Sequence, residues 1–487
     1  MKGKDSPQLS RVHRAVAATI ARRSHVAVAG LAIGLLAQPA FAIDAEVQQQ
    51  LEMMRKQIET LQAKLDQQQV AQAKIEEQVH SGSPSTRGGP EVSFGGQYRI
   101  NAYSGDEDYD SGDTQTASRA RIRQNVDVKF TDNFKTHFQV ELGHTTDNLT
   151  TTQSSTRGND VSVRHAVLDY TFTNGINMQA GIVPLTDHFG DALFSSAWDY
   201  NPVALSFTAP MGAGTGRAFA AALRENNEAD NDDDTTHYQL DYDLPLSDGN
   251  KINLGVSYLT KDDGTGDSQS AANFGIGGRF GLGGNLALNA FLIGSYTDEE
   301  LIGSNDKGSG AAIKLELTGK MGSGNFGLMV THASGDEDGE GFIPVMALSG
   351  ANGYWGYTGL LTVQGPTDTG LGDSDAVNIS NNGYGMTSVQ AKLAFPITAD
   401  LSGYIGAGWF GNTDARDRDS TVGYDIIAMG TYRFNKYLAV DFGGAFASLE
   451  DSVSQYYNGI VGGTNFNQAI NEDRDKTMLF TRLQAEF

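Results

Sequence analysis

Four arginines stand out as groups that could do chemistry, because each lies in a segment where polar and apolar residues alternate. They are Arg99, Arg121, Arg123 and Arg482. A guanidinium stays charged at physiological pH and binds carboxylate or phosphate groups through paired hydrogen bonds. If these side chains share one surface, that surface attracts anions.

Groups of the opposite sign lie in residues 185–234. They are Asp187, Asp191 and Asp199, and they accompany His188 and Trp198. Opposed rows of acids and bases across a narrow space create a field that orients dipolar solutes. The alternative for this acidic stretch is an ordinary solvated loop, since loops are normally polar.

No pattern typical of a catalytic centre accompanies these groups. The chain has no Cys, which excludes disulfides, thiolate metal sites and cysteine nucleophiles. Neither H-E-x-x-H nor G-x-S-x-G occurs in the sequence. We therefore expect no enzymatic activity, no cofactor and no metal site. Acidic stretches such as residues 105–113 and 228–234 do not match the EF-hand loop, so whether they bind calcium stays open.

The elements that must position these groups are strands. From residue 92 onward, segments of about ten residues alternate in polarity, as where Tyr238 and Leu240 alternate with His237 and Gln239. This is the sequence pattern of transmembrane barrel strands, which turn apolar side chains to lipid and polar ones to the lumen. No segment after the leader approaches the roughly 18 consecutive apolar residues of a membrane-spanning helix. The sequence therefore predicts an all-β, antiparallel transmembrane β-barrel over residues 92–487.

The connections between these segments alternate between short and long, which predicts sixteen strands with both termini at the short-turn side. Residues 217–223 could form another strand, but counting it alone would reverse the side of every later connection. We therefore assign it to a long third loop over residues 185–234, and a count of eighteen stays open as the alternative. The alternation is irregular in residues 161–173, where we expect a β-bulge.

In a closed barrel the last strand pairs with the first, so the four arginines fall on one patch of wall near mid-membrane. A charge facing lipid at that depth costs about 2–4 kcal/mol, which favours the lumen. Because rings of charged side chains select ions, we interpret this patch as a pore constriction. Arg119, on the same face, is expected nearer the outer mouth. The alternative is that each arginine merely pairs with a neighbouring acid.

Residues 1–42 have the three parts of a secretory signal peptide: a basic leader, a short apolar run and an A-x-A cleavage pattern. The leader holds six of the 35 Lys and Arg and one of the 59 acids, so the remaining chain has 29 and 58 and a net charge of −29. Nucleic-acid binding requires a basic footprint, so we expect none.

Residues 43–80 predict a helix that self-associates as a coiled coil. Apolar residues recur at alternating steps of four and three, and the seam is Val47, Leu51, Met54, Ile58, Leu61, Leu65, Gln68, Gln72, Ile75 and Val79. The alternative is a single amphipathic helix packed on a domain. Residues 81–91 are rich in Ser, Gly and Pro and predict a flexible linker.

Residues 477–487 form an alternating strand that ends at Phe487. This ending resembles the C-terminal signature of bacterial outer-membrane proteins. Together with the leader, the strands and the long third loop, the chain resembles the trimeric porins. The heptad segment resembles porins with a periplasmic coiled coil, such as the sucrose-, phosphate- and dicarboxylate-type porins.

The resemblance implies an outer-membrane location, a homotrimer, a periplasmic coiled coil, and contact with the lipid bilayer and lipopolysaccharide. It also implies a third loop folded into the barrel, which would place Asp187, Asp191 and Asp199 across the constriction from the arginines. The expected function is passive diffusion of small hydrophilic solutes, with a lean toward anions. The alternatives are an outer-membrane adhesin or structural tether with long surface loops, or a barrel enzyme. The sequence leaves the solute unidentified and the ion preference unsettled.

Overall fold

A computed structural model of the chain describes residues 89–106, 114–142, 161–198, 200–224, 235–262, 268–298, 308–335, 341–344, 356–359, 385–414, 420–450 and 474–487. The predicted signal peptide and coiled coil lie outside the described residues, as does most of the predicted linker. Residues 90–487 form one structural unit, which is described below. The described residues contain no helix that is long and apolar enough to span a membrane.

The described part of this unit is an antiparallel sheet of 18 strands. The strands are β1 (Glu91–Asp106), β2 (Thr114–Thr131), β3 (Phe134–Leu142), β4 (Val161–Thr171), β5 (Asn177–Ile182), β6 (Val203–Met211), β7 (Gly214–Arg224), β8 (Thr235–Pro245), β9 (Lys251–Asp262), β10 (Ser268–Gly283), β11 (Leu286–Thr297), β12 (Gly308–Met321), β13 (Gly324–Ala333), β14 (Met386–Pro396), β15 (Leu401–Asn412), β16 (Thr421–Arg433), β17 (Leu438–Leu449) and β18 (Arg474–Glu486). Two short 3₁₀ turns, η2 (Ser196–Trp198) and η3 (Ser247–Gly249), lie in the connections.

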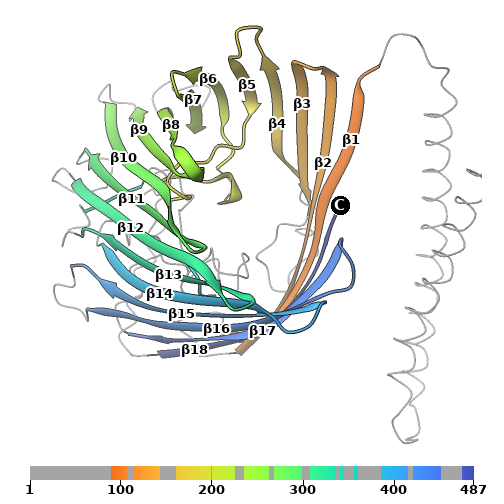
Figure 1. Ribbon diagram of the computed structural model, residues 1–487, viewed down its shortest axis with the longest axis vertical. Coiled ribbons are helices and arrows are strands. Elements are labelled where there is room, and N and C mark those ends of the chain that lie inside the picture. Colours follow the sequence, from red (N-terminus) through yellow and green to blue (C-terminus); the bar gives the residue numbers. More distant parts are fainter. Residues whose placement is uncertain are drawn as a thin grey trace, which may run out of the picture. The chain divides into compact units, whose positions relative to one another are not determined.

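The sheet closes on itself, because β1 pairs with β2 along one edge and with β18 along the other. Figure 1 shows the strands of this unit as a ring seen from one end. The last residue takes part in the closure. Phe487 exchanges two backbone hydrogen bonds with Gly96, at 3.0 and 3.2 Å, and its ring meets that of Tyr98 edge-on at 5.3 Å. The predicted pairing of the last strand with the first is confirmed.

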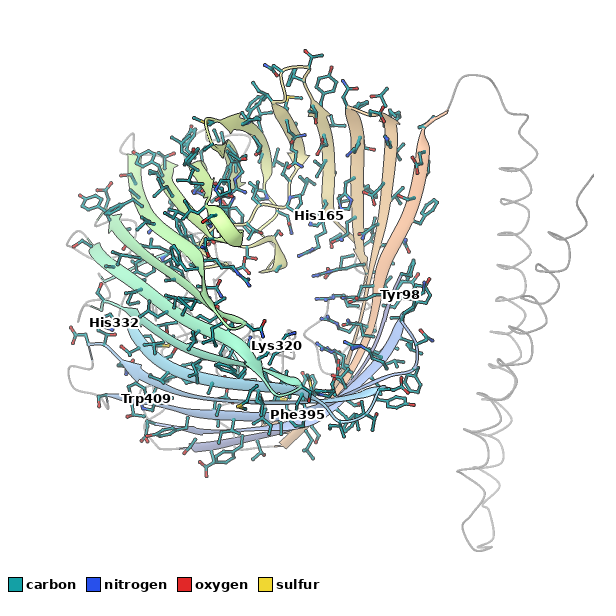
Figure 2. All side chains as sticks on the ribbon, in the orientation of Figure 1. Tyr98, His165, Lys320, His332, Phe395 and Trp409 are labelled. Atoms are coloured by element: carbon teal, nitrogen blue, oxygen red, sulfur yellow. The ribbon has the colours of Figure 1, made fainter. Side chains whose placement is uncertain are left out.

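Alternation along each strand sorts side chains between the two faces of the wall. On β8, Tyr238 and Leu240 are 48% and 62% exposed on the outer face, whereas His237 and Gln239 are 0% and 2% exposed on the inner face. Figure 2 shows Tyr98 outside the ring and His165 inside it. Soluble proteins rarely expose a continuous apolar surface of this kind. An apolar outer face around a polar interior is the distribution that a barrel in a bilayer requires.

Short turns join the strands at one end of the barrel and long connections join them at the other. Gly284 and Asn285 form a two-residue turn between β10 and β11 with φ angles of +59° and +70°. Tight hairpins need this left-handed backbone, which Gly and Asn adopt at the least cost. All seven short turns predicted from the sequence are found, and residues 212–213 add an eighth.

The predicted count of sixteen strands is wrong, and so is the extent of the third loop. Residues 203–211 and 214–224 form β6 and β7, so the loop covers residues 183–202 instead of 185–234. A single extra strand would move every later connection to the opposite end of the barrel. Because β6 and β7 add two strands, each later connection stays at the end where it was predicted. The sequence prediction misses β6, so the segment 217–223 stands alone there and is assigned to the loop to keep the sides of the later connections.

Candidate functional site

The predicted arginines lie on three adjacent strands around the seam where the barrel closes. Arg99 on β1 is directly opposite Arg121 on β2, and Arg123 is opposite Gln97. Arg482 on β18 is one step along the same face, opposite Asn101. Arg99 and Arg121 are only 4% and 7% exposed, as expected for side chains folded against the inner wall. We call these four residues the arginine wall.

Each arginine of the wall is held by an acceptor on a neighbouring strand. Arg99 Nε donates to Gln484 Oε1 at 2.9 Å, and Arg121 Nη2 donates to Gln97 Oε1 at 2.7 Å. The other two bind acids: Arg482 Nε lies 2.7 Å from Asp441 Oδ2, and Arg123 Nε donates to Glu141. The alternative reading of the sequence, local pairing with acids, thus holds for Arg482 and Arg123. Local pairing does not exclude a shared surface, because the paired arginines lie on the same inner face of the barrel.

A fifth arginine, Arg164 on β4, extends this surface. Its Nη1 donates to Gln139 Oε1 at 3.0 Å, its Nε lies 3.8 Å from Glu141 Oε2, and its Nη2 donates to the carbonyl of Ser196 in the third loop. The sequence prediction missed it because a β-bulge shifts the register between Gln139 and Val140 and breaks the alternation. The bulge itself is confirmed where it was expected.

The structure describes only the backbone of one further predicted residue, Arg119, and does not describe another, Asp199. Arg119 sits on β2 opposite Asn101, one step further from the short-turn end than Arg121, and nothing is described of its side chain. Asp199 lies outside the described residues.

The third loop folds into the barrel. Its apolar residues form one buried cluster with inner-face residues of β7, β11, β12 and β13. Figure 1 shows the chain between β5 and β6 running on the inner side of the ring. Phe189, near the tip of the loop, packs on a flat patch of glycines. A Cβ atom at Gly255 on β9 or at Gly275 on β10 would lie 2.9 or 2.8 Å from its ring.

Asp187 organises the tip of this loop. Its carboxylate accepts backbone N–H groups from Phe189 at 2.7 Å, Asp191 at 3.0 Å, Phe194 at 3.1 Å and also Leu193. Asp191 has a φ of +65°, an unfavourable angle for a non-glycine residue that this turn stabilises. Burial raises the pKa of Asp187 from 3.8 to about 6, although the backbone donors act to lower it. The carboxylate is therefore engaged by its own loop.

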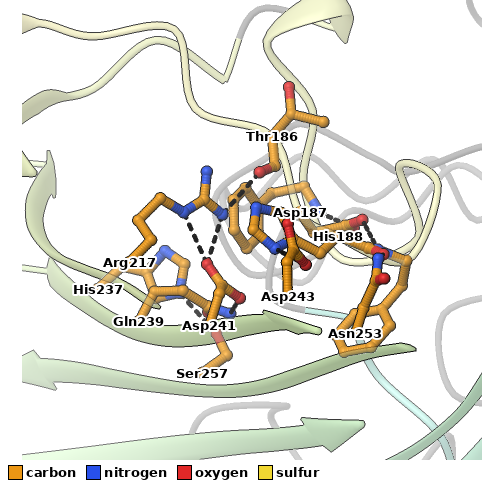
Figure 3. A network of polar contacts seen from close by, with 12 residues as sticks. Thr186, Asp187, His188, Arg217, His237, Gln239, Asp241, Asp243, Asn253 and Ser257 are labelled. Carbon is orange, nitrogen blue, oxygen red and sulfur yellow. Dashed lines mark hydrogen bonds and ion pairs between the residues drawn. The ribbon is translucent and has the colours of Figure 1, made fainter. Parts of the chain in front are cut away.

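A polar network fixes the loop to the wall (Figure 3). Arg217 on β7 donates from Nη2 to the Thr186 carbonyl at 2.8 Å and from Nε to Asp241 Oδ2 at 2.7 Å. Asn253 on β9 donates to the carbonyl of His188 at 2.5 Å, and His188 Nδ1 lies 2.9 Å from Asp243 Oδ1. The bonds from Arg217 and Asn253 satisfy the carbonyl groups of Thr186 and His188, which have no partner in a β-sheet.

A second connection also enters the barrel, which the sequence did not predict. The Asn273 side chain donates to the Ile343 carbonyl at 3.0 Å, and Ile343 N–H donates to Ser295 Oγ at 3.2 Å. Tyr357 donates its hydroxyl to Glu316 on β12, and Lys392 on β14 lies 4.0 Å from the centre of its ring. Residues 341–344 and 356–359 thus cover inner faces that the third loop leaves uncovered. Neither has a motif that would have revealed this docking.

The arrangement can hold and orient ions, but it has no recognisable catalytic geometry in the part of the chain that the structure describes. One arc of the inner wall is arginine-rich, and loops fill the arc from β7 to β14. Across the described ranges, no group of three or more His, Cys, Asp or Glu side chains could hold a metal ion.

The comparisons with known proteins agree with this architecture. No protein-family model matches the chain, and no curated protein sequence matches it. Among solved structures, OccK9 (OpdG) of Pseudomonas aeruginosa is similar with a TM-score of 0.51 and 11% identity, covering 82% of this chain and 99% of that chain. At this identity the likeness shows a shared barrel fold and no more.

Two further solved structures are less similar. OccK11 (OpdR) of Pseudomonas aeruginosa has a TM-score of 0.48 and 11% identity, covering 82% of this chain and 96% of that chain. The anion-selective porin from Comamonas acidovorans has a TM-score of 0.43 and 10% identity, covering 82% and 100%.

Proposed function

We propose that this chain is an outer-membrane channel through which small hydrophilic solutes diffuse passively. The observation that carries the proposal is the closed barrel, with an apolar outer face and an inner face of charged and polar side chains. The apolar outer face is stable when lipid surrounds it, and the polar inner side chains are stable when water fills the lumen. A loop folded inside gives the lumen a narrow point, as a selective pore requires.

The arginine wall gives this channel a lean toward anions. Five guanidinium groups, including that of Arg164, share one inner surface. Glu141 serves Arg123 and Arg164, and Asp441 serves Arg482, whereas the amide acceptors of Arg99 and Arg121 carry no charge. The positive charge concentrated on this surface attracts anions, and salt in the pore screens it in part.

Several features inferred from the sequence belong to the same proposal. The barrel associates as a homotrimer, residues 43–80 form a coiled coil in the periplasm, and the long loops face outward, where they contact lipopolysaccharide. The distribution of connections supports this orientation, because bacterial barrels place their short turns on the periplasmic side. Of the acids of the third loop, Asp191 would border the constriction, whereas the buried carboxylate of Asp187 holds the backbone of its own loop.

Liposome swelling tests the channel function directly. Vesicles with the reconstituted protein should swell in isotonic small sugars and should stay intact in a large polysaccharide. An adhesin or a barrel enzyme would leave the vesicles impermeable to both. The sign of the reversal potential in a salt gradient then reports the ion preference, and a cation-selective value would reject the anion lean.

A further inference from the structure

Two histidines on adjacent strands meet inside the barrel. His137 on β3 and His165 on β4 approach with ring centres 5.4 Å apart, and the closest nitrogens, His137 Nε2 and His165 Nδ1, are 3.2 Å apart. The bulge that displaces Arg164 brings His165 opposite Gln139, which places the two rings side by side. His165 is 7% exposed, and the His137 side chain is 30% exposed toward the lumen.

The outer nitrogens of the pair both donate to oxygen acceptors. His137 Nδ1 lies 2.7 Å from Asp127 Oδ1, and His165 Nε2 lies 3.1 Å from Asn201 Oδ1. A neutral imidazole carries one N–H, so a proton used on the outer nitrogen leaves a lone pair on the inner one. Arg164 Nη1 is also 3.4 Å from His165 Nε2, but it donates at the shorter distance of 3.0 Å to Gln139. With both rings neutral, these lone pairs face each other and a cation between them stabilises the contact, whereas a His137 protonated on both nitrogens donates from Nε2 to His165 Nδ1.

We propose that His137 and His165 bind a divalent transition metal, Zn²⁺ or Cu²⁺, between these two nitrogens. Zinc–imidazole bonds of about 2.0–2.1 Å place two ligands of a tetrahedral ion about 3.3 Å apart. The observed 3.2 Å fits this spacing with little movement of either ring. Imidazole is a preferred ligand of both ions.

Two histidines supply only two of the four ligands of a tetrahedral metal ion, so the surroundings must supply the others. A pocket of about 440 Å³ opens beside His137 and gives water room to complete the coordination. Its charged lining residues include Asp127, Asp169, Lys129 and Lys135. Asp127 and Asn201 act as the outer partners that orient metal-binding imidazoles and raise their basicity. Arg164, Arg123, Lys129 and Lys135 oppose a cation here, and Asp127, Asp169 and Glu141 offset part of their charge.

Bound metal would change the channel, and this consequence rests on the proposed function. Asn201 belongs to the returning part of the third loop, so the metal would tie that loop to β3 and β4 through His165. It would also add two positive charges beside the arginine wall. Micromolar Zn²⁺ should therefore shift the reversal potential further toward anions.

Metal binding itself is tested without a membrane, so its failure is distinguishable from failure of the channel function. Cu²⁺ is titrated into the detergent-solubilised protein and followed by calorimetry and electron paramagnetic resonance. We expect one saturable site whose spectrum shows coupling to two nitrogens. His137→Gln or His165→Gln should weaken binding at least tenfold. Asp127→Asn keeps both ligands and should weaken binding by about 10- to 100-fold.

His332→Gln is the matched control, because His332 is an exposed histidine on β13 that bonds Thr387 instead of another imidazole. It should leave the affinity unchanged. Equal affinity in the wild type and the His137 and His165 variants would overturn the proposal. So would a wild-type spectrum with coupling to a single nitrogen, a result that requires no variant to fold.

Discussion

At the scale of single residues, the charge that a solute meets depends on the partners of each arginine. Glu141 acts on two arginines at once, since it lies between Arg123 and Arg164 and is itself buried. Gln139, Gln97 and Gln484 orient their arginines without cancelling charge. The selectivity of the wall is thus adjustable at its acceptors as well as at its arginines.

Replacing Glu141 by Gln should make the channel more anion-selective. The change removes one negative charge and keeps a hydrogen-bond acceptor for both arginines. A unit charge at 4 Å is worth about 1 kcal/mol in a water-like dielectric, so the anion-to-cation permeability ratio should rise by roughly 2- to 5-fold. Reversal potentials in a salt gradient measure this ratio. An unchanged reversal potential would show that Glu141 is not part of the conducting surface.

The buried carboxyl of Asp187 should titrate near pH 6. Its pKa in the folded protein is raised by burial from 3.8 to about 6. On the linkage rule, its contribution to the free energy of unfolding is fully present below about pH 3.8 and is lost as the pH rises through about 6. Infrared spectroscopy should show a carboxylic acid signal that disappears around pH 6 and is absent in Asp187→Asn. Loss of the signal already below pH 4.5 would contradict this assignment.

At the scale of elements, the third loop is held by apolar packing at its tip and by polar bonds along its length. Phe189 is 3% exposed between the glycines of β9 and β10 and meets Phe291 edge-on at 6.3 Å. Arg217 and Asn253 then hold the backbone on either side of Asp187. The loop is therefore docked inside the barrel by several contacts, and Phe189 is the aromatic anchor of its tip.

Phe189→Ala should loosen this constriction. Truncating a buried Phe costs about 3–5 kcal/mol, which falls on the docking of the loop because the barrel hydrogen bonds are unaffected. Single-channel recordings should show a larger conductance with more current noise. The control is Phe94→Ala, which removes a ring that is 69% exposed on the outer face. Unchanged conductance in Phe189→Ala, with both variants folded, would show that the loop does not limit the pore.

The same elements explain how far the sequence could be interpreted. Period-two alternation was enough to predict the barrel, seven of its eight short turns and the inner placement of Arg99 and Arg121. It failed for β6, and without β6 the segment 217–223 is a single extra strand that conflicts with the sides of the later connections. It also failed at Arg164, where the bulge inverts the alternation. The docking of Phe342 and Tyr357 depends on surfaces brought together only by the closed sheet, so no local pattern reveals it.

At the scale of the whole molecule, assembly remains a hypothesis carried by the heptad seam of residues 43–80. Replacing Ile58 and Leu61 by Asp would place charges in that seam, which a coiled coil cannot bury without a large cost. The isolated peptide should lose helicity in circular dichroism and association in analytical ultracentrifugation. Lys56→Asp with Thr60→Asp, two changes off the seam, should preserve both. Unchanged association of the Ile58 and Leu61 variant would rule out the coiled coil.

The central claim is that the arginine wall sets the ion preference of a conducting pore. The most direct measurement is the reversal potential of the Arg121→Gln, Arg123→Gln double variant in a salt gradient. Removing two charges worth about 1 kcal/mol each at 4 Å should shift the permeability ratio toward cations by roughly 5- to 30-fold before salt screening. Arg279→Gln, near the short-turn end of β10, should shift it far less. A double variant that conducts with an unchanged reversal potential would contradict the account.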